Sequence, residues 1–113
     1  MKENDRAITE KQLAAIRAII AQPNARGAQL VLATYSREEF VELRPGDDYD
    51  AFKRQERIVT KALVREGLAG RVVFQEVDSV GYYEFIGKRG LPNCDSSRAA
   101  YAAAKWNPAQ RGS

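Results

Sequence analysis

The sequence predicts an α+β protein in which helices pack on a small, mainly antiparallel sheet. Three observations support this fold class. Short apolar runs bounded by turn residues indicate strands at 29–35, 71–77 and 81–86. Stretches with a 3.6-residue apolar period and capping residues indicate helices before, between and after these strands. The length of 113 residues, with 44% apolar and 29% charged residues, is typical of a single domain spanning 1–113.

The chain is expected to begin with a helix. Thr9 and Gln12 have the spacing of a capping box, which predicts that the helix starts at Thr9. Pro23 is expected to stop this helix at about Gln22, before a turn. The charged segment 1–7 would then precede the helix, and we expect it to be flexible.

A strand and a short helix are predicted next. The apolar run 29–35 indicates the strand. Ser36 and Glu39 form a second capping box, which predicts a helix at Arg37–Leu43. The alternative interpretation, that the strand continues through Arg37–Leu43, is left open by the sequence.

The clearest amphipathic stretch is 48–66, which predicts a long helix capped by Asp47 or Asp48. On a helical projection, one face is apolar and consists of Ala51, Phe52, Ile58, Val59, Ala62 and Leu63. The opposite face is basic and consists of Lys53, Arg54, Arg57, Lys61 and Arg65. This helix is therefore expected to pack against the core with one face and to present cations with the other.

The second half of the chain is expected to contain a β-hairpin and a last helix. The runs 71–77 and 81–86 read as strands and are separated by the short turn Asp78-Ser79-Val80, as in a hairpin. A loop is predicted at 87–93, and an alanine-rich helix at 97–105. The tail 107–113 is predicted to be flexible.

The expected order is α-β-α-α-β-β-α, and its first six elements resemble those of a winged helix-turn-helix. This resemblance rests on the order of elements alone. It implies a DNA-binding transcriptional regulator, in which Lys53, Arg54 and Arg57 would contact DNA and the hairpin would be the wing. Three acids on the preceding helix would repel phosphate: Glu38, Glu39 and Glu42.

The basic helix face is also the best candidate for binding a partner of another class. In the loop that follows the predicted hairpin, Lys88 and Arg89 would extend the basic surface, and Tyr82 is a candidate anchor. Complementary protein surfaces use charges of both signs, so a protein partner is favoured over nucleic acid. The oligomeric state is not indicated.

Catalysis and metal binding have little support in the composition. The chain has no histidine, and no acids or nucleophiles stand at a diagnostic spacing, so we expect no enzyme, metal or cofactor. A single cysteine, Cys94, indicates a reducing, cytoplasmic setting, and no apolar run is long enough to cross a membrane. These features are typical of a small accessory, adaptor or inhibitory protein, such as those of phages and mobile elements.

Overall fold

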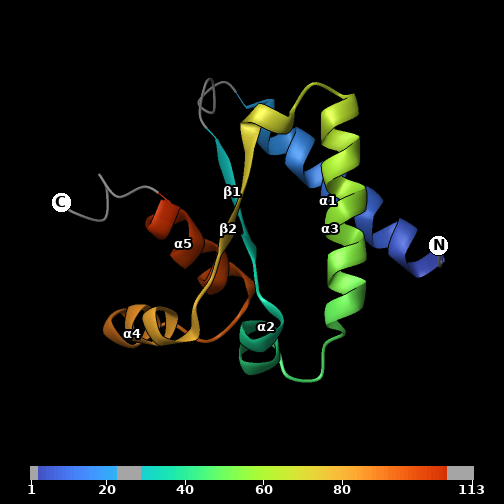
Figure 1. Cartoon of the computed structure of the whole chain (residues 1–113). Helices are drawn as coiled ribbons and strands as arrows, with labels where there is room; N and C mark the ends of the chain where they lie inside the picture. The colour runs from blue at the N-terminus through green and yellow to red at the C-terminus, as the bar shows by residue number, and fades with distance from the viewer. Residues whose placement is uncertain (1–2, 23–28, 107–113) are drawn as a thin grey trace. The chain divides into compact units, whose positions relative to one another are not determined.

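The computed structural model describes residues 3–22 and 29–106, and it confirms the α+β class. Figure 1 shows the elements in chain order. They are α1 (Glu3–Ile20), β1 (Leu30–Thr34), α2 (Arg37–Leu43), α3 (Tyr49–Arg65), the 3-10 helix η2 (Ala69–Arg71), β2 (Val72–Glu76), α4 (Ser79–Arg89) and α5 (Asp95–Trp106). The turn predicted after the first helix and the tail 107–113 lie outside the described residues.

The chain divides into two compact units. Unit 1 consists of Met1–Leu30 and Asp48–Val73, and its helices are α1, α3 and η2. Unit 2 consists of Val31–Asp47 and Phe74–Ser113, and its helices are α2, α4 and α5. That residues 1–113 form one domain stays a prediction.

The prediction of an antiparallel sheet is wrong. Strands β1 and β2 form a two-stranded parallel sheet. The amide of Val77, directly after β2, also donates to the carbonyl of Thr34 at 3.0 Å. Parallel strands need a long crossover connection, and here that connection contains α2 and α3.

The predicted hairpin is also wrong, because residues 81–86 belong to helix α4. Asp78 caps this helix by accepting a hydrogen bond from the Gly81 amide at 2.9 Å. Gly90 ends it in the left-handed conformation, with φ of 65°. The order of helices and strands is therefore α-β-α-α-β-α-α, and the wing that the winged-helix interpretation requires is replaced by a helix.

Helix α1 begins earlier than the sequence indicates. It starts at Glu3, so part of the segment 1–7 is helical rather than flexible. Thr9 is 2% exposed, and its hydroxyl donates to the carbonyl of Arg6 at 3.0 Å. Thr9 thus lies inside the helix, and the capping box predicted there is wrong.

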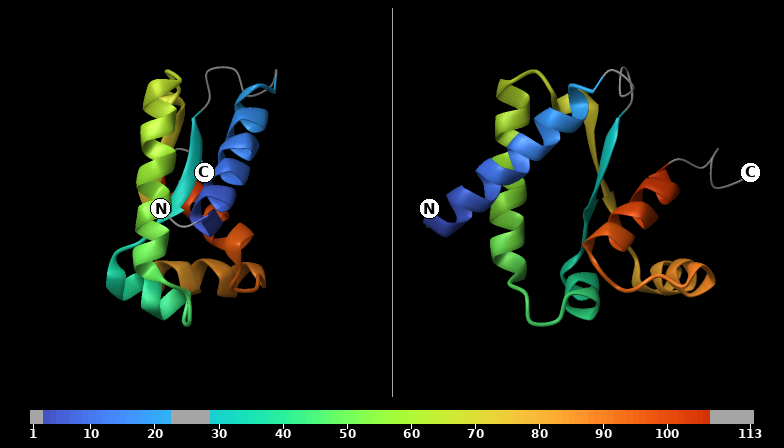
Figure 2. Two further views of the ribbon diagram at one scale, coloured as in Figure 1. Left: turned by 90° about the vertical axis from the view of Figure 1, so that its right-hand side faces the viewer. Right: turned by 180° about the vertical axis from the view of Figure 1, so that it is seen from behind.

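In unit 1, α1 packs against α3, as both Figure 1 and Figure 2 show. The apolar face predicted for α3 is confirmed at three positions, Val59, Ala62 and Leu63, which are at most 3% exposed. Ile58, predicted on the same face, is instead half-buried and lines a hollow together with cations of α3. The guanidinium of Arg17 on α1 donates twice to the Glu66 carboxylate at the end of α3, at 2.7 and 2.6 Å. This bidentate pair links the C-terminal ends of the two helices.

In unit 2, α2 and α4 meet around buried aromatic side chains. Residues Arg37–Leu43 are helical, so the alternative of a continued strand is wrong. Ser36 caps α2 as predicted, and Tyr35 packs edge-on against Phe40 with ring centroids 5.7 Å apart. The carboxylate of Glu39 does not complete a capping box in the structure. It accepts a hydrogen bond from the Ser79 amide at 2.8 Å, which joins α2 to the start of α4.

Candidate functional site

Helix α3 carries the candidate site, and its start is set by a local cap. Asp48 accepts a hydrogen bond from the Ala51 amide at 3.1 Å, which confirms one of the two predicted caps. The helix then runs for 17 residues, long enough to bury one face along α1 while another stays in solvent.

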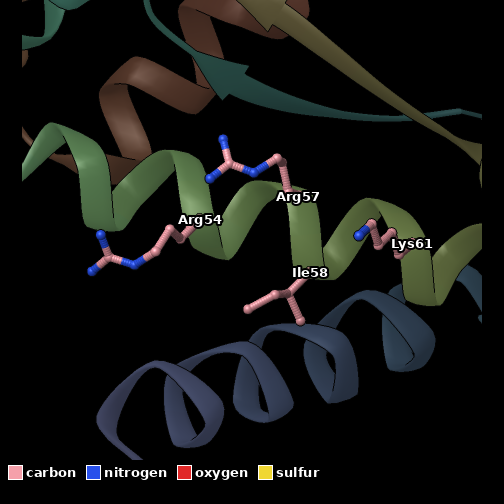
Figure 3. A pocket seen from close by; sticks show the side chains of 4 residues that line it. All are labelled: Arg54, Arg57, Ile58 and Lys61. Atoms are coloured by element: carbon pink, nitrogen blue, oxygen red, sulfur yellow. The ribbon is translucent and has the colours of Figure 1, made fainter. Parts of the chain in front are cut away.

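Four residues of α3 share one side of the helix, because their spacing of i, i+3, i+4 and i+7 returns to the same face. We call this set the cationic stripe. It consists of Arg54, Arg57, Ile58 and Lys61. Figure 3 shows the four side chains leaving consecutive turns of α3, with Ile58 directed toward α1. They line a surface hollow of about 370 Å³.

The cationic stripe combines exposed charge with a partly covered apolar side chain. Arg57 and Lys61 are exposed, whereas Arg54 and Ile58 are half-buried. Within residues 3–22 and 29–106, no carboxylate forms an ion pair with Arg57 or Lys61. Their charges are therefore available to an external anionic group, and Ile58 offers an apolar contact between them.

Two cations predicted for the same face do not line this hollow. Lys53 pairs with Glu56 at 3.2 Å, and its ammonium lies 5.7 Å from the Tyr49 ring centroid. Its charge is thus used within α3. Arg65 is exposed at the end of the helix, next to Glu66, whose pKa is lowered chiefly by the hydrogen bond from Arg17.

Lys88 and Arg89 lie in the last turn of α4, in unit 2, and not in a loop. Lys88 forms an exposed ion pair with Glu84 at 2.9 Å. The Arg89 guanidinium lies 4.0 Å from the Phe85 ring centroid. Cations in the last helical turn stabilise the helix through its dipole, which accounts for both residues without a ligand.

Tyr82 does not offer the surface that an anchor requires. It is 0% exposed, and its hydroxyl donates to the Asn93 side chain at 2.9 Å. Its neighbour Tyr83 is 42% exposed instead. On a strand these two side chains would point to opposite faces, whereas on helix α4 Tyr82 is buried and Tyr83 is exposed.

The shifted pKa values of Asp78 and Cys94 in unit 2 are explained by their contacts within the fold. Burial raises the pKa of the Asp78 carboxyl, but hydrogen bonds from Lys105, Tyr101 and the Gly81 amide outweigh it and hold that pKa well below its usual range. Hydrogen bonds with the Ser96 and Ser97 hydroxyls lower the pKa of the Cys94 thiol to about 7.

Metal-binding and membrane-spanning features are also absent from the described part of the chain. No group of three or more histidine, cysteine or acidic side chains is placed to hold a metal ion there. None of the helices in these ranges is long and apolar enough to cross a membrane.

Comparison with known proteins gives no relative: no family model, curated protein or solved structure matches this chain. The candidate function therefore rests on the geometry and chemistry of the cationic stripe.

Proposed function

We propose that this chain is a small, non-catalytic cytoplasmic protein that binds an acidic surface of a partner protein through the cationic stripe. It would act as an accessory, adaptor or inhibitory protein by covering that surface. The observation that carries the proposal is the pair Arg57 and Lys61. Both are exposed, neither forms an ion pair with a described residue, and both flank Ile58.

The two kinds of side chain in the stripe have different effects on binding. Exposed cations speed the encounter with an acidic surface and orient it, but they are screened by salt. An apolar contact that loses water at the centre of an interface supplies most of the lasting affinity. Ile58 is half-buried among the cations, so a partner would need an apolar group surrounded by carboxylates.

A protein is favoured over nucleic acid as the partner. The first turn of α3 carries Asp50, and Asp48 caps the helix, so phosphates that followed α3 toward its start would meet negative charge. A protein surface can place a cation or a neutral group at that point. The loss of the wing also removes the structural basis for a winged-helix reader of DNA.

The proposal is tested by a pull-down from cell lysate, with and without nuclease, followed by mass spectrometry. Wild type is compared with Arg57→Glu/Lys61→Glu, which reverses the two exposed cations. The matched control is Arg6→Glu/Lys11→Glu, which changes net charge equally at two exposed positions of α1. We expect a defined protein that nuclease does not release, that the control retains and that the stripe variant loses.

Two results would contradict this function. Recovery of material that leaves entirely with nuclease would identify nucleic acid as the partner. Equal recovery by wild type and both variants would mean that the stripe is only a solvated face.

A further inference from the structure

A second exposed surface, on unit 2, has the opposite charge. Three large apolar side chains are exposed on α2 and α4: Val41 on α2 is 62% exposed, and Val80 and Tyr83 on α4 are 81% and 42% exposed. Two exposed acids, Glu38 and Glu42, accompany Val41 on α2. We call these residues the acidic patch. It consists of Glu38, Val41, Glu42, Val80 and Tyr83.

Hydrogen bonds between the helices hold the acidic patch together. The Tyr83 hydroxyl donates to Glu42 Oε2 at 2.8 Å, and the Ser79 amide donates to Glu39 Oε2 at 2.8 Å. The hydrogen bond to Glu42 is also the main reason why the pKa of Tyr83 is raised. Each carboxylate has further lone pairs, so Glu42 remains able to accept a bond from a cation.

The acidic patch and the cationic stripe are complementary in pattern as well as in sign. On α2, the exposed Val41 lies on the same face as Glu38, three residues before it, and Glu42, one residue after it. On α3, Ile58 lies on the same face as three cations. These are Arg54, four residues before it, Arg57, one residue before it, and Lys61, three residues after it. Helical repeats of equal pitch can thus bring opposite charges together on both sides of an apolar contact.

We propose that a second copy of this chain docks its acidic patch on the cationic stripe. Glu38 and Glu42 of one copy then face Arg57 and Lys61 of the other, and Val41 packs beside Ile58. The inference rests on the proposed function of the stripe and names its partner. Each copy carries one surface of each kind, so two copies can make the contact twice, or longer assemblies can form head to tail.

The test is sedimentation velocity of the full chain over a range of concentrations. We expect self-association that weakens roughly tenfold when salt is raised from about 0.05 M to about 0.5 M, because screening shortens the range of the charges to below about 5 Å. Arg57→Glu/Lys61→Glu and Glu38→Lys/Glu42→Lys should each weaken association at least tenfold, roughly the effect of placing like charges together. The control Arg6→Glu/Lys11→Glu should not.

Complementation separates a direct contact from a folding defect. A mixture of the two reversed variants retains one intact stripe and one intact patch, so the mixture should associate although each variant alone does not. The chain that carries all four reversals exchanges the two charges and should associate with itself again. A variant that failed to fold would show neither rescue.

Three results would overturn the inference. These are a wild type that stays monomeric at every concentration, association that survives both reversals, and loss of association that neither the mixture nor the four-fold reversal restores. Failure of the general function is distinguishable. If wild type is monomeric but the stripe still captures an acidic protein, the function stands and the self-docking fails.

Discussion

Replacing Gly81 by alanine should destabilise the fold, although the same replacement ordinarily stabilises a helix by about 1 kcal/mol. Gly81 lies in the first turn of α4, where its amide donates to Asp78 Oδ2 at 2.9 Å. A Cβ at this position would overlap the Tyr101 hydroxyl and lie 2.6 Å from Asp78 Oδ2. The new methyl group therefore meets both partners of the bond that Tyr101 donates to Asp78 at 2.7 Å.

The magnitude follows from what the methyl group must displace. The Tyr101 ring packs against Tyr82 and Phe85, with centroids 5.8 and 5.4 Å away, so it has little room to move aside. Loss of a hydrogen bond to a carboxylate costs about 1.5–3 kcal/mol, and a weakened helix cap costs about 1 kcal/mol. After the gain of about 1 kcal/mol in helix propensity, we expect a net loss of roughly 2 kcal/mol.

Gly87→Ala is the matched control, because Gly87 lies in the same helix and a Cβ there would meet nothing within 4 Å. It should raise the free energy of unfolding by about 0.5–1 kcal/mol. Urea unfolding followed by circular dichroism measures both variants. The two variants should change the free energy of unfolding in opposite directions. A Gly81→Ala protein as stable as Gly87→Ala would refute the reasoning. Combination with Tyr101→Phe should recover part of the loss, because it removes the hydroxyl that the methyl group meets.

Three further predictions concern unit 2. The pKa of Asp78 is lowered in the fold, so its contribution is complete above its usual pKa of 3.8 and is lost as pH falls below that value. Asp78→Asn should therefore be less stable than wild type by roughly 1 kcal/mol at pH 7, allowing for solvent screening, and this difference should shrink steadily as pH falls below 3.8; parallel curves of stability against pH would contradict this. Tyr82→Phe should cost about 1 kcal/mol, because Asn93 loses a buried donor, whereas Tyr83→Phe at the exposed neighbour should cost much less in the same urea assay. Alkylation of Cys94 by iodoacetamide should reach half its maximal rate near pH 7, because the pKa of the thiol is lowered to about 7; a midpoint close to 9 would show that the serine hydroxyls have no effect.

The elements that the sequence predicts correctly are those with local causes. Ser36 and Asp48 cap α2 and α3 through bonds to amides three residues away, and such short-range contacts can be recognised in a sequence. The same holds for the stripe, because helical spacing alone groups Arg54, Arg57 and Lys61. The sequence does not predict which cations of α3 are already paired within the chain. The ion pair of Lys53 with Glu56, for example, depends on side-chain conformations that are set only in the folded chain.

Residues 81–86 show why the remaining elements could not be predicted. Their tyrosine, phenylalanine and isoleucine side chains favour strands locally. In the fold, Tyr82 becomes fully buried, and helix α4 brings it there. Signals for a helix were nevertheless present, since Asp78 and Gly90 have the positions of caps and Glu84 pairs with Lys88 one turn later. These helix signals compete with the strand preference of the aromatic and β-branched side chains. Only the packing of the aromatic rings decides which of the two structures forms.

Arg57 and Lys61 differ from many cations of the described residues, because no described carboxylate forms an ion pair with either of them. Six other cations do form ion pairs with acids: Arg17, Arg44, Lys53, Lys88, Arg98 and Lys105. Arg57 and Lys61 instead stand one turn apart with like charge, which destabilises an exposed helix by about 0.2–0.5 kcal/mol. An acidic partner would remove this repulsion on binding. The folded chain thus carries a small unfavourable term on the side of α3 that, under the proposal, an outside carboxylate would contact.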